Sequence, residues 1–168
     1  TASGGPFLNL NKRKLNKINV SQALKHPNWK MGKKISVDSS TLMNKVFEVI
    51  EAKHIFELPY NKISILTHPS SYVHAIVKFS NGLIKIIAHD TTMKIPIFNT
   101  IFTDDKNKIF SKKINLTKLN TLNLKKVDIE HFPSIKITKK LPNKISLYES
   151  VIVCVNDRLV NLFLKKKN

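Results

Sequence analysis

Polar side chains suited to holding an anion are concentrated in the first third of the chain. Ser3 precedes Gly4-Gly5, and such a loop offers a hydroxyl and unobstructed backbone N–H groups, the components of an oxyanion or phosphate nest. Ser39 stands in a run of residues that favour helix N-termini, where free N–H groups and the helix dipole favour an anion. These two serines predict a site for a phosphate-like group.

Three further polar residues follow with helical spacing. Asn44 and Lys45 could add a donor and a positive charge to the same phosphate. Glu48 lies one turn further on, and an acidic residue on an otherwise donor-rich face is suited to a hard cation. Structural alternatives stay open: Ser39 as only a cap, Lys45 and Glu48 as only a surface ion pair, and the glycines as only a turn.

The element that would position these residues is a helix predicted over residues 40–56. At about 100° per residue its apolar side chains fall on one arc. The predicted core face holds Leu42, Met43, Val46, Phe47, Ile50 and His54. The opposite arc holds Asn44, Lys45, Glu48 and Glu51. Burial of the first arc would leave the chemically useful residues pointing the same way.

Beyond Pro59 the apolar period changes from helical to two, as in strands. Residues 63–66 are a predicted buried strand, and residues 73–79 and 83–88 are predicted to pair around Asn81-Gly82, a type I′ hairpin signal. Further helices are predicted at 93–102, 132–141 and 155–164, and a strand near 122–127. The predicted fold class is α+β, with a small mixed or antiparallel sheet that contains a hairpin and packs against helices.

Length and composition exclude several classes of protein and of site. The chain has 168 residues, 42% of them hydrophobic, which is enough for one domain with a core. No stretch approaches the roughly 18 uncharged apolar residues of a membrane helix. Cys154 is the single cysteine, so it excludes an internal disulfide and a cysteine metal cluster and suits a reducing compartment.

The charge is strongly basic, with 29 basic against 11 acidic residues and a net charge of +18. Only Arg13 and Arg158 are arginine, the side chain preferred for bidentate phosphate and guanine recognition. Lysine, isoleucine and asparagine are abundant and share AT-rich codons, so base-composition drift explains the charge without a ligand. A basic nucleic-acid-binding module therefore stays only the third interpretation.

Three strings of residues carry a family resemblance: TASGGPF at 1–7, HPNWKMGKKISVDS at 26–39 and MNKVFE at 43–48. In residues, order and spacing they closely resemble 1-deoxy-D-xylulose 5-phosphate reductoisomerase, the enzyme of the non-mevalonate isoprenoid pathway. Weaker matches extend the resemblance over nearly the whole chain: His68-Pro69-Ser70, His74, Met93, Pro96-Ile97, Phe132-Pro133 and Asn156-Asp157.

The resemblance implies an activity. The family isomerises 1-deoxy-D-xylulose 5-phosphate by a carbon-skeleton rearrangement and reduces the resulting aldehyde with NADPH, giving 2-C-methyl-D-erythritol 4-phosphate. Mg²⁺ or Mn²⁺ holds the substrate's oxygens. The implied partner is a small sugar phosphate, with no nucleic acid or membrane, and the full-length protein is expected to be a homodimer. The implied location is the bacterial cytoplasm, or a plastid in a eukaryote.

The resemblance also implies roles for individual residues. The positions that match residues gripping the substrate, chiefly its phosphate, are Ser3, Ser39, Asn44 and Lys45. His26 matches a substrate-contacting residue on a mobile flap, and Trp29 and Met31 match its lid. Gly32 matches a backbone contact to NADPH. Glu48 matches one of three acidic metal ligands.

Departures from the family pattern set further expectations. The family's glycine-rich dinucleotide turn, catalytic lysine and Asp-Ser-Glu cluster belong upstream of Thr1, and its C-terminal helical domain belongs after Asn168. His89-Asp90-Thr91-Thr92 replaces a Gly-x-Pro-Asp stretch, and Val46-Phe47 replaces Gly-Leu. Residues 1–168 are thus expected to be a central catalytic domain that is inactive in isolation. The second interpretation is a non-catalytic remnant that keeps only the fold and a pairing surface.

Overall fold

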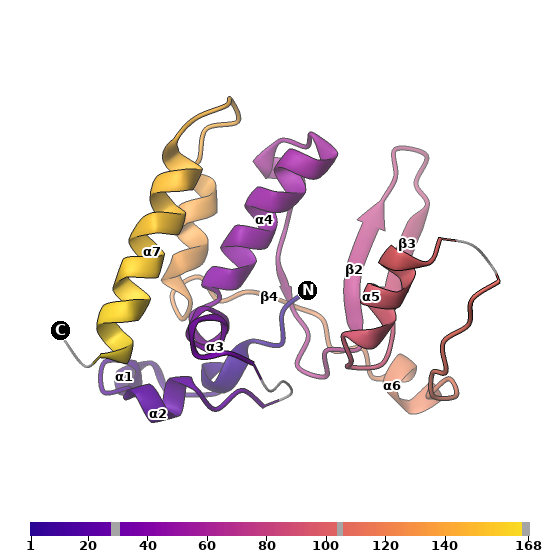
Figure 1. Ribbon diagram of the computed structural model, residues 1–168, viewed down its shortest axis with the longest axis horizontal. Helices are drawn as coiled ribbons and strands as arrows, with labels where there is room; N and C mark the ends of the chain where they lie inside the picture. Colours follow the sequence, from indigo (N-terminus) through magenta and orange to yellow (C-terminus); the bar gives the residue numbers. More distant parts are fainter. Residues whose placement is uncertain (28–30, 104–105, 166–168) are drawn as a thin grey trace.

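The computed structural model describes residues 1–27, 31–103 and 106–165. Most of its helices gather in one half of the molecule, and a β-hairpin with the helices α5 (Lys94–Ile101) and α6 (Leu116–Asn120) forms the other half (Figure 1). The hairpin consists of β2 (Val73–Lys78) and β3 (Ile84–Ala88), and the helix beside it is α5. The α+β class predicted from the sequence is confirmed.

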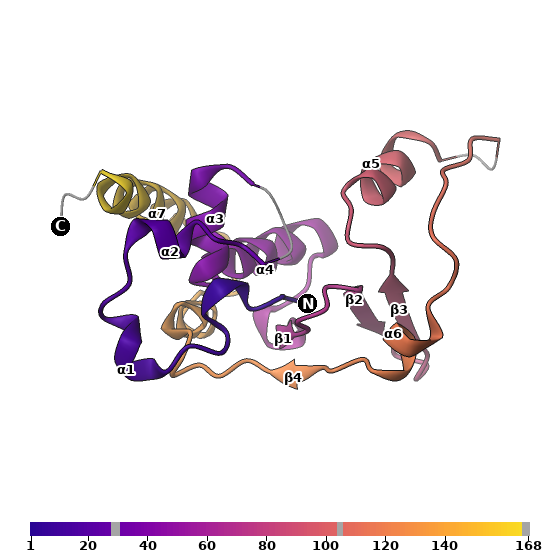
Figure 2. The same cartoon turned by 90° about the horizontal axis from the view of Figure 1, so that it is seen from below.

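The helical half is built around α3 (Lys33–Ser40), α4 (Met43–Phe56) and α7 (Tyr148–Leu164), with the 3₁₀ helix η3 (Pro133–Lys139) beside α4. Its largest cluster of buried side chains comprises Ala2, Leu42, Met43, Val46, Phe132 and Ile135. Of the short helices near the N-terminus, η1 (Gly5–Phe7) and α2 (Val20–Ala23) contact α3, and α1 (Lys12–Leu15) lies further from it (Figure 2). Helix α4 packs on the largest cluster, and α3 packs through Val37 on a second cluster with Phe7, Ala23 and Val160.

The helix predicted over residues 40–56 is two helices, which corrects the expected N-terminus. Leu42 separates α3 from α4 with a left-handed φ of 58°. The hydroxyls of Ser40 and Thr41 donate to the Val37 carbonyl at 2.8 and 3.2 Å, so these residues end a helix instead of starting one. Leu42, Met43 and Val46 are buried as predicted.

The predicted burial of one residue on the core face of α4 was wrong. His54 is exposed, and its neighbour Lys53 is buried instead. The apolar period could not anticipate a buried lysine, because the burial depends on Glu149 of α7 and on Tyr60 of the 3₁₀ helix η2 (Tyr60–Lys62).

Two small antiparallel sheets complete the fold. The first sheet pairs β1 (Leu66–Thr67) with β4 (Lys125–Lys126), and Ala2 adds a parallel bridge to Thr67. The predicted strand at 63–66 is thus shorter and shifted. The second sheet is the β2–β3 hairpin, antiparallel as predicted.

The hairpin turn differs from the type I′ prediction. The Phe79 N–H donates to the Leu83 carbonyl at 2.9 Å, and only Gly82 in this loop has a positive φ, of 86°. The side chain of Asn81 instead accepts from the Leu83 N–H at 3.1 Å. The result is a three-residue loop with glycine in the left-handed region, the next most common hairpin connection.

The remaining helices and strands form where the sequence predicts them, but they begin and end at different residues. The predicted helix at 93–102 is α5, and the one at 155–164 is α7, which begins earlier, at Tyr148. The predicted helix at 132–141 is the 3₁₀ helix η3, and the strand predicted near 122–127 is β4, preceded by α6 (Leu116–Asn120). Among the described residues, no helix is long and apolar enough to cross a membrane.

Candidate functional site

The Ser3 loop is held in an unusual backbone conformation. Gly4 and Gly5 have φ values of 89° and 62°, which glycine adopts without the strain that other residues incur. The Gly5 N–H donates to Ser3 Oγ at 3.3 Å, and the same oxygen lies 3.3 Å from His26 Nε2. Ser3 and His26, predicted to contact one ligand, are therefore neighbours.

Ser39 packs against this loop at Gly5. A Cβ built on Gly5 would lie 2.7 Å from the Ser39 carbonyl oxygen, so only glycine permits the approach. Ser39 is 5% exposed and lies in the last turn of α3. The predicted position at a helix N-terminus was wrong, and with it the helix-dipole argument for this serine. Close packing of the glycine loop on α3 positions Ser39 instead.

The polar residues of α4 form a second group. Lys45 Nζ donates to both carboxylate oxygens of Glu48 at 2.8 Å, which confirms that these residues share one face. From the sequence, Lys45 and Glu48 could form either a ligand site or only a surface ion pair. The observed contact is an ion pair. Glu48 is exposed, whereas Lys45 is half-buried.

Asn44 carries an oxygen that lacks a partner. Within the described residues, Asn44 Oδ1 and His68 Nδ1 are the buried side-chain polar atoms without a hydrogen bond. Leaving such an atom unsatisfied costs about 1–3 kcal/mol, so each case calls for an explanation. A ligand that donates to Asn44 would remove this cost.

Thr1, two residues before Ser3, is hydrogen-bonded to the start of β2. Its nitrogen donates to the His74 carbonyl at 3.0 Å, and its hydroxyl donates to the Val73 carbonyl. Burial lowers the pKa of His26, which favours a neutral imidazole beside Ser3.

Gly32, the predicted cofactor contact, lies away from Ser39. Gly32 precedes the first turn of α3, and its carbonyl accepts from the backbone and side chain of Ser36. It therefore lies at the opposite end of α3 from Ser39, roughly 10 Å along the axis. Met31 is half-buried, and Trp29 lies outside the described residues.

A cavity of about 510 Å³ opens beside the Ser3 loop. Ser3, Gly5, Lys25 and Pro27 are among the residues that line it. Ser39, Asn44, Lys45 and Glu48 do not line it, so it extends from the loop group alone.

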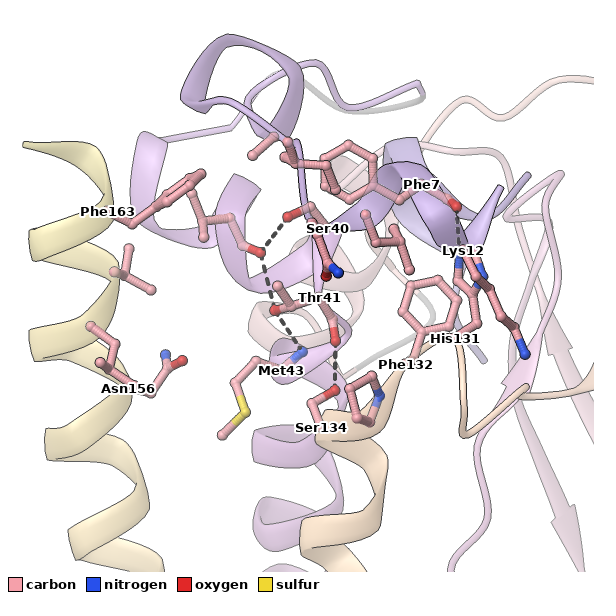
Figure 3. A pocket seen from close by; sticks show the side chains of 18 of the residues that line it. Phe7, Lys12, Ser40, Thr41, Met43, His131, Phe132, Ser134, Asn156 and Phe163 are labelled. Carbon is pink, nitrogen blue, oxygen red and sulfur yellow. Dashed lines mark hydrogen bonds between the residues drawn. The ribbon is translucent and has the colours of Figure 1, made fainter. Parts of the chain in front are cut away.

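A larger cavity of about 700 Å³ lies between α1, α3, α7 and η3 (Figure 3). Several of its polar side chains bond the backbone: His131 Nε2 lies 2.7 Å from the Phe7 carbonyl, and the Ser134 hydroxyl donates to the Thr41 carbonyl at 2.6 Å (Figure 3). Apolar side chains such as Phe7, Val37 and Phe163 form much of the remaining wall. The predicted substrate residues do not line this cavity.

Metal-binding capacity is limited in the part of the chain that the structure describes. No three histidine, cysteine, aspartate or glutamate side chains there lie close enough to hold an ion. Glu48 offers one exposed carboxylate, and a hard cation requires several oxygen ligands. The donor chemistry fits Mg²⁺ or Mn²⁺ only if other oxygens complete the shell.

Two features near or behind the site were missed by the sequence reasoning. His74 and His89 stack with ring centroids 3.6 Å apart, and the His74 carbonyl accepts from the Thr1 amino group at 3.0 Å. The sequence marked His74 only as a weak match. The second feature is the buried Lys53–Glu149 pair, for which the only signal was a lysine close to an otherwise apolar helix face.

Hydroxyl, amide, ammonium and carboxylate groups thus converge at one end of α3 and α4, on an α+β scaffold. This combination has the donor chemistry that a phosphorylated ligand requires. Comparison with known proteins makes the assignment specific. Two family models match, the "1-deoxy-D-xylulose 5-phosphate reductoisomerase C-terminal domain" over residues 1–56 and the "DXP reductoisomerase C-terminal domain" over residues 90–168. The chain belongs to the 1-deoxy-D-xylulose 5-phosphate reductoisomerase family.

Relatives and solved structures agree with this assignment. The reductoisomerase of Pelagibacter ubique is 59% identical over 167 residues, and that of Persephonella marina is 43% identical over 169 residues; each match covers 99% of this chain. The enzyme from Zymomonas mobilis in complex with NADPH superposes over 99% of the chain with a TM-score of 0.87 at 32% identity. A second reductoisomerase, in complex with NADPH, fosmidomycin and magnesium, superposes over 98% with a TM-score of 0.83 at 32% identity.

The chain is shorter than these proteins. It spans 43% and 45% of the length of the two curated relatives, and 42% and 40% of the two solved chains.

Proposed function

We propose that residues 1–168 are the central catalytic domain of an NADPH- and divalent-metal-dependent reductoisomerase that converts 1-deoxy-D-xylulose 5-phosphate to 2-C-methyl-D-erythritol 4-phosphate. The names of the relatives support the reaction. The observation that carries the proposal is the convergence of the Ser3 loop, Ser39 and the Asn44–Lys45–Glu48 face, with a buried Asn44 oxygen left without a partner.

The proposed substrate grip uses four residues of this chain. The hydroxyls of Ser3 and Ser39, the amide NH2 of Asn44 and the ammonium of Lys45 donate to the phosphate, because such donors make charge-assisted hydrogen bonds to its oxygens. The buried Asn44 oxygen accepts from a hydroxyl of the sugar. His26, already 3.3 Å from Ser3, contacts the substrate as part of a flap. Trp29 and Met31 form the lid of that flap, and the backbone of Gly32 contacts NADPH.

Glu48 is the proposed metal ligand within this domain. A bound Mg²⁺ or Mn²⁺ would polarise the substrate oxygens and hold them in place. Glu48 would hold the cation in place of its 2.8 Å contacts with Lys45, and Lys45 would then be available to the phosphate. Further oxygen ligands would be needed to complete the shell.

The rest of the enzyme is proposed to supply an N-terminal NADPH-binding domain and the remainder of the C-terminal helical domain, a family model of which already matches residues 90–168. Residues 1–168 in isolation are proposed to be inactive. The relatives are bacterial, and the proposed location is the cytoplasm of a bacterium.

A homodimer is proposed for the full-length enzyme, and the hairpin supports it. All five residues of β3 are exposed, among them Ile84 at 55%, Ile86 at 51% and Ile87 at 52%. Exposed apolar side chains of this density mark an interaction surface. A second copy of the chain is the proposed partner.

Replacing a relative's matching segment tests the activity. The segment of the Pelagibacter ubique enzyme that aligns with this chain is exchanged for residues 1–168, and NADPH oxidation with the sugar phosphate is measured. The chimera should be active, Lys45→Ala should lower kcat/KM at least about 100-fold, and exposed Lys62→Ala should leave it unchanged. A folded but inactive chimera would support the remnant interpretation instead.

The flap assignment has a separate test, since Trp29 is the only tryptophan of the chain. In a chimera whose other tryptophans are replaced, substrate analogue, metal and NADPH together should shift its fluorescence to the blue, as closure over a ligand excludes water. Emission that is already blue and does not respond to the ligands would identify Trp29 as a static core residue.

A further inference from the structure

Two imidazole rings meet at the base of the hairpin, beside the candidate site. The rings of His74 and His89 are 3.6 Å apart between centroids and 9° from parallel. The His74 carbonyl accepts at 3.0 Å from the nitrogen of Thr1, two residues before Ser3. His74 therefore lies beside the segment that leads into the Ser3 loop.

An irregularity in the hairpin brings the two rings together. Val73 pairs with Ala88, but Ala75 pairs with Ile87, so the register shifts at His74. Such bulges redirect a side chain and are frequent next to active sites. Beyond β3, the His89 N–H still donates to the Tyr72 carbonyl at 3.1 Å, which keeps His89 alongside the start of β2.

Hydrogen bonds determine which ring nitrogens carry a proton. His74 Nε2 lies 3.2 Å from the His89 carbonyl oxygen, and His89 Nδ1 lies 2.7 Å from the Asp90 carbonyl oxygen. A carbonyl can only accept, so each of these nitrogens carries hydrogen. In the neutral rings, His74 Nδ1 and His89 Nε2 keep their lone pairs.

We propose that His89 is a positioning residue that holds the His74 imidazole in one orientation and one tautomer at the edge of the substrate site. The stacked ring fixes the plane of His74, and the His89 carbonyl fixes its Nε2–H. His74 Nδ1 is then a permanent acceptor for a hydroxyl of the sugar phosphate. The identity of that ligand rests on the proposed function, whereas the positioning does not.

The surrounding charges favour the neutral ring that this role requires. Burial lowers the pKa of His74 most, and the charges of His89 and Lys45 lower it further. The hydrogen bond to the His89 carbonyl acts in the opposite direction. Removing the His89 ring takes away both part of the burial and one like charge, so the pKa of His74 should then rise.

Imidazole NMR on the ¹⁵N-labelled chain, without any ligand, tests the positioning. In the unmodified chain, His74 should be a single Nε2–H tautomer near pH 7.5. In His89→Ala, the tautomers should mix and the titration midpoint of His74 should rise by about half a pH unit or more. His89→Phe keeps a flat ring and should retain the single tautomer, which separates stacking from a general loss of structure.

The exposed His54 provides the matched control, because His54→Phe should leave the His74 signals unchanged. Three results would overturn the proposal: an Nδ1–H tautomer in the unmodified chain, no change in His89→Ala, or mixed tautomers in a folded His89→Phe. None of these measurements involves substrate. An inactive chimera with the expected His74 signals would count against the enzyme and leave the positioning intact.

Discussion

The helical half and the hairpin half of this molecule are packed very differently. In the helical half, Val46 is fully buried and the charged pair Lys53–Glu149 is enclosed between α4 and α7. In the hairpin half, every residue of β3 is exposed, and of β2 only Val73, at its base, is buried. The grip residues lie in the packed half, so their geometry is held by the core, whereas the hairpin contributes only His74 at its buried end.

Breaking the buried ion pair should have the largest effect on the packed half. Glu149 accepts from Tyr60 at 3.0 Å and from Ser146 at 2.5 Å, and it faces Lys53 at 3.5 Å. Glu149→Ala should lower the free energy of unfolding by about 3 kcal/mol, because it leaves the Lys53 charge buried and unpaired. Urea denaturation measures this. Exposed Glu51→Ala is the control and should change stability by less than about 0.5 kcal/mol.

Lowering the pH should destabilise the helical half by protonating Glu149. Burial raises the pKa of this carboxyl, but hydrogen bonds from Ser146 and Tyr60 and the charge of Lys53 outweigh it and lower the value to about 2, from 4.5. A lowered folded-state pKa stabilises the fold above the unfolded value, and that stability is lost as pH falls from 4.5 toward 2. Glu149→Gln should flatten the stability profile in this window. A profile identical to that of the unmodified chain would contradict the assignment.

Truncating one apolar side chain in each half tests the difference in packing between the helical half and the hairpin half. Val46→Ala should cost about 2 kcal/mol, because it opens a cavity in a closed core. Ile86→Ala, at a residue 51% exposed, should cost less than about 0.5 kcal/mol in the monomer. Equal losses in thermal unfolding would mean that the hairpin is covered in solution, as in a dimer.

Two glycines with similar backbones give a matched pair. Gly5 and Gly82 have φ values of 62° and 86°, so an alanine is strained by about 1 kcal/mol at either place. Only at Gly5 would the added methyl meet the Ser39 carbonyl, whereas Gly82 has open space. Gly5→Ala should therefore cost about 2 kcal/mol. In the chimera it should also raise KM for the sugar phosphate, while Gly82→Ala should leave KM unchanged.

Glu48→Gln should have the smallest effect on stability and a large one on metal binding. The side chain is exposed, so the free energy of unfolding should change by no more than about 0.5 kcal/mol. In the chimera, the Mn²⁺ concentration for half-maximal activity should rise, because a carboxylate ligand becomes a neutral amide. Unchanged activity at every Mn²⁺ concentration would leave Glu48 as a surface partner of Lys45.

Sequence predictions succeeded where the signal is local. The hairpin strands were recognised because alternating residues and Asn81-Gly82 are local signals. The turn type was not, because Asn81 can satisfy the backbone with its side chain instead of taking a positive φ. The cluster Asp38-Ser39-Ser40-Thr41 suggested a helix start for a similar reason: hydroxyl side chains bond the backbone at either end of a helix, and the local pattern does not say which.

The sequence by itself determined the fold class, the helical face with Lys45 and Glu48, and the family, because each depends on short-range periodicity or on strings of residues in fixed order. Tertiary structure alone decided that Gly5 packs on Ser39, that Lys53 is buried against Glu149, and that His89 stacks on His74. Each of these contacts joins residues at least 15 positions apart. Their geometry comes from how the chain packs around a common core, and local pattern carries no record of that packing.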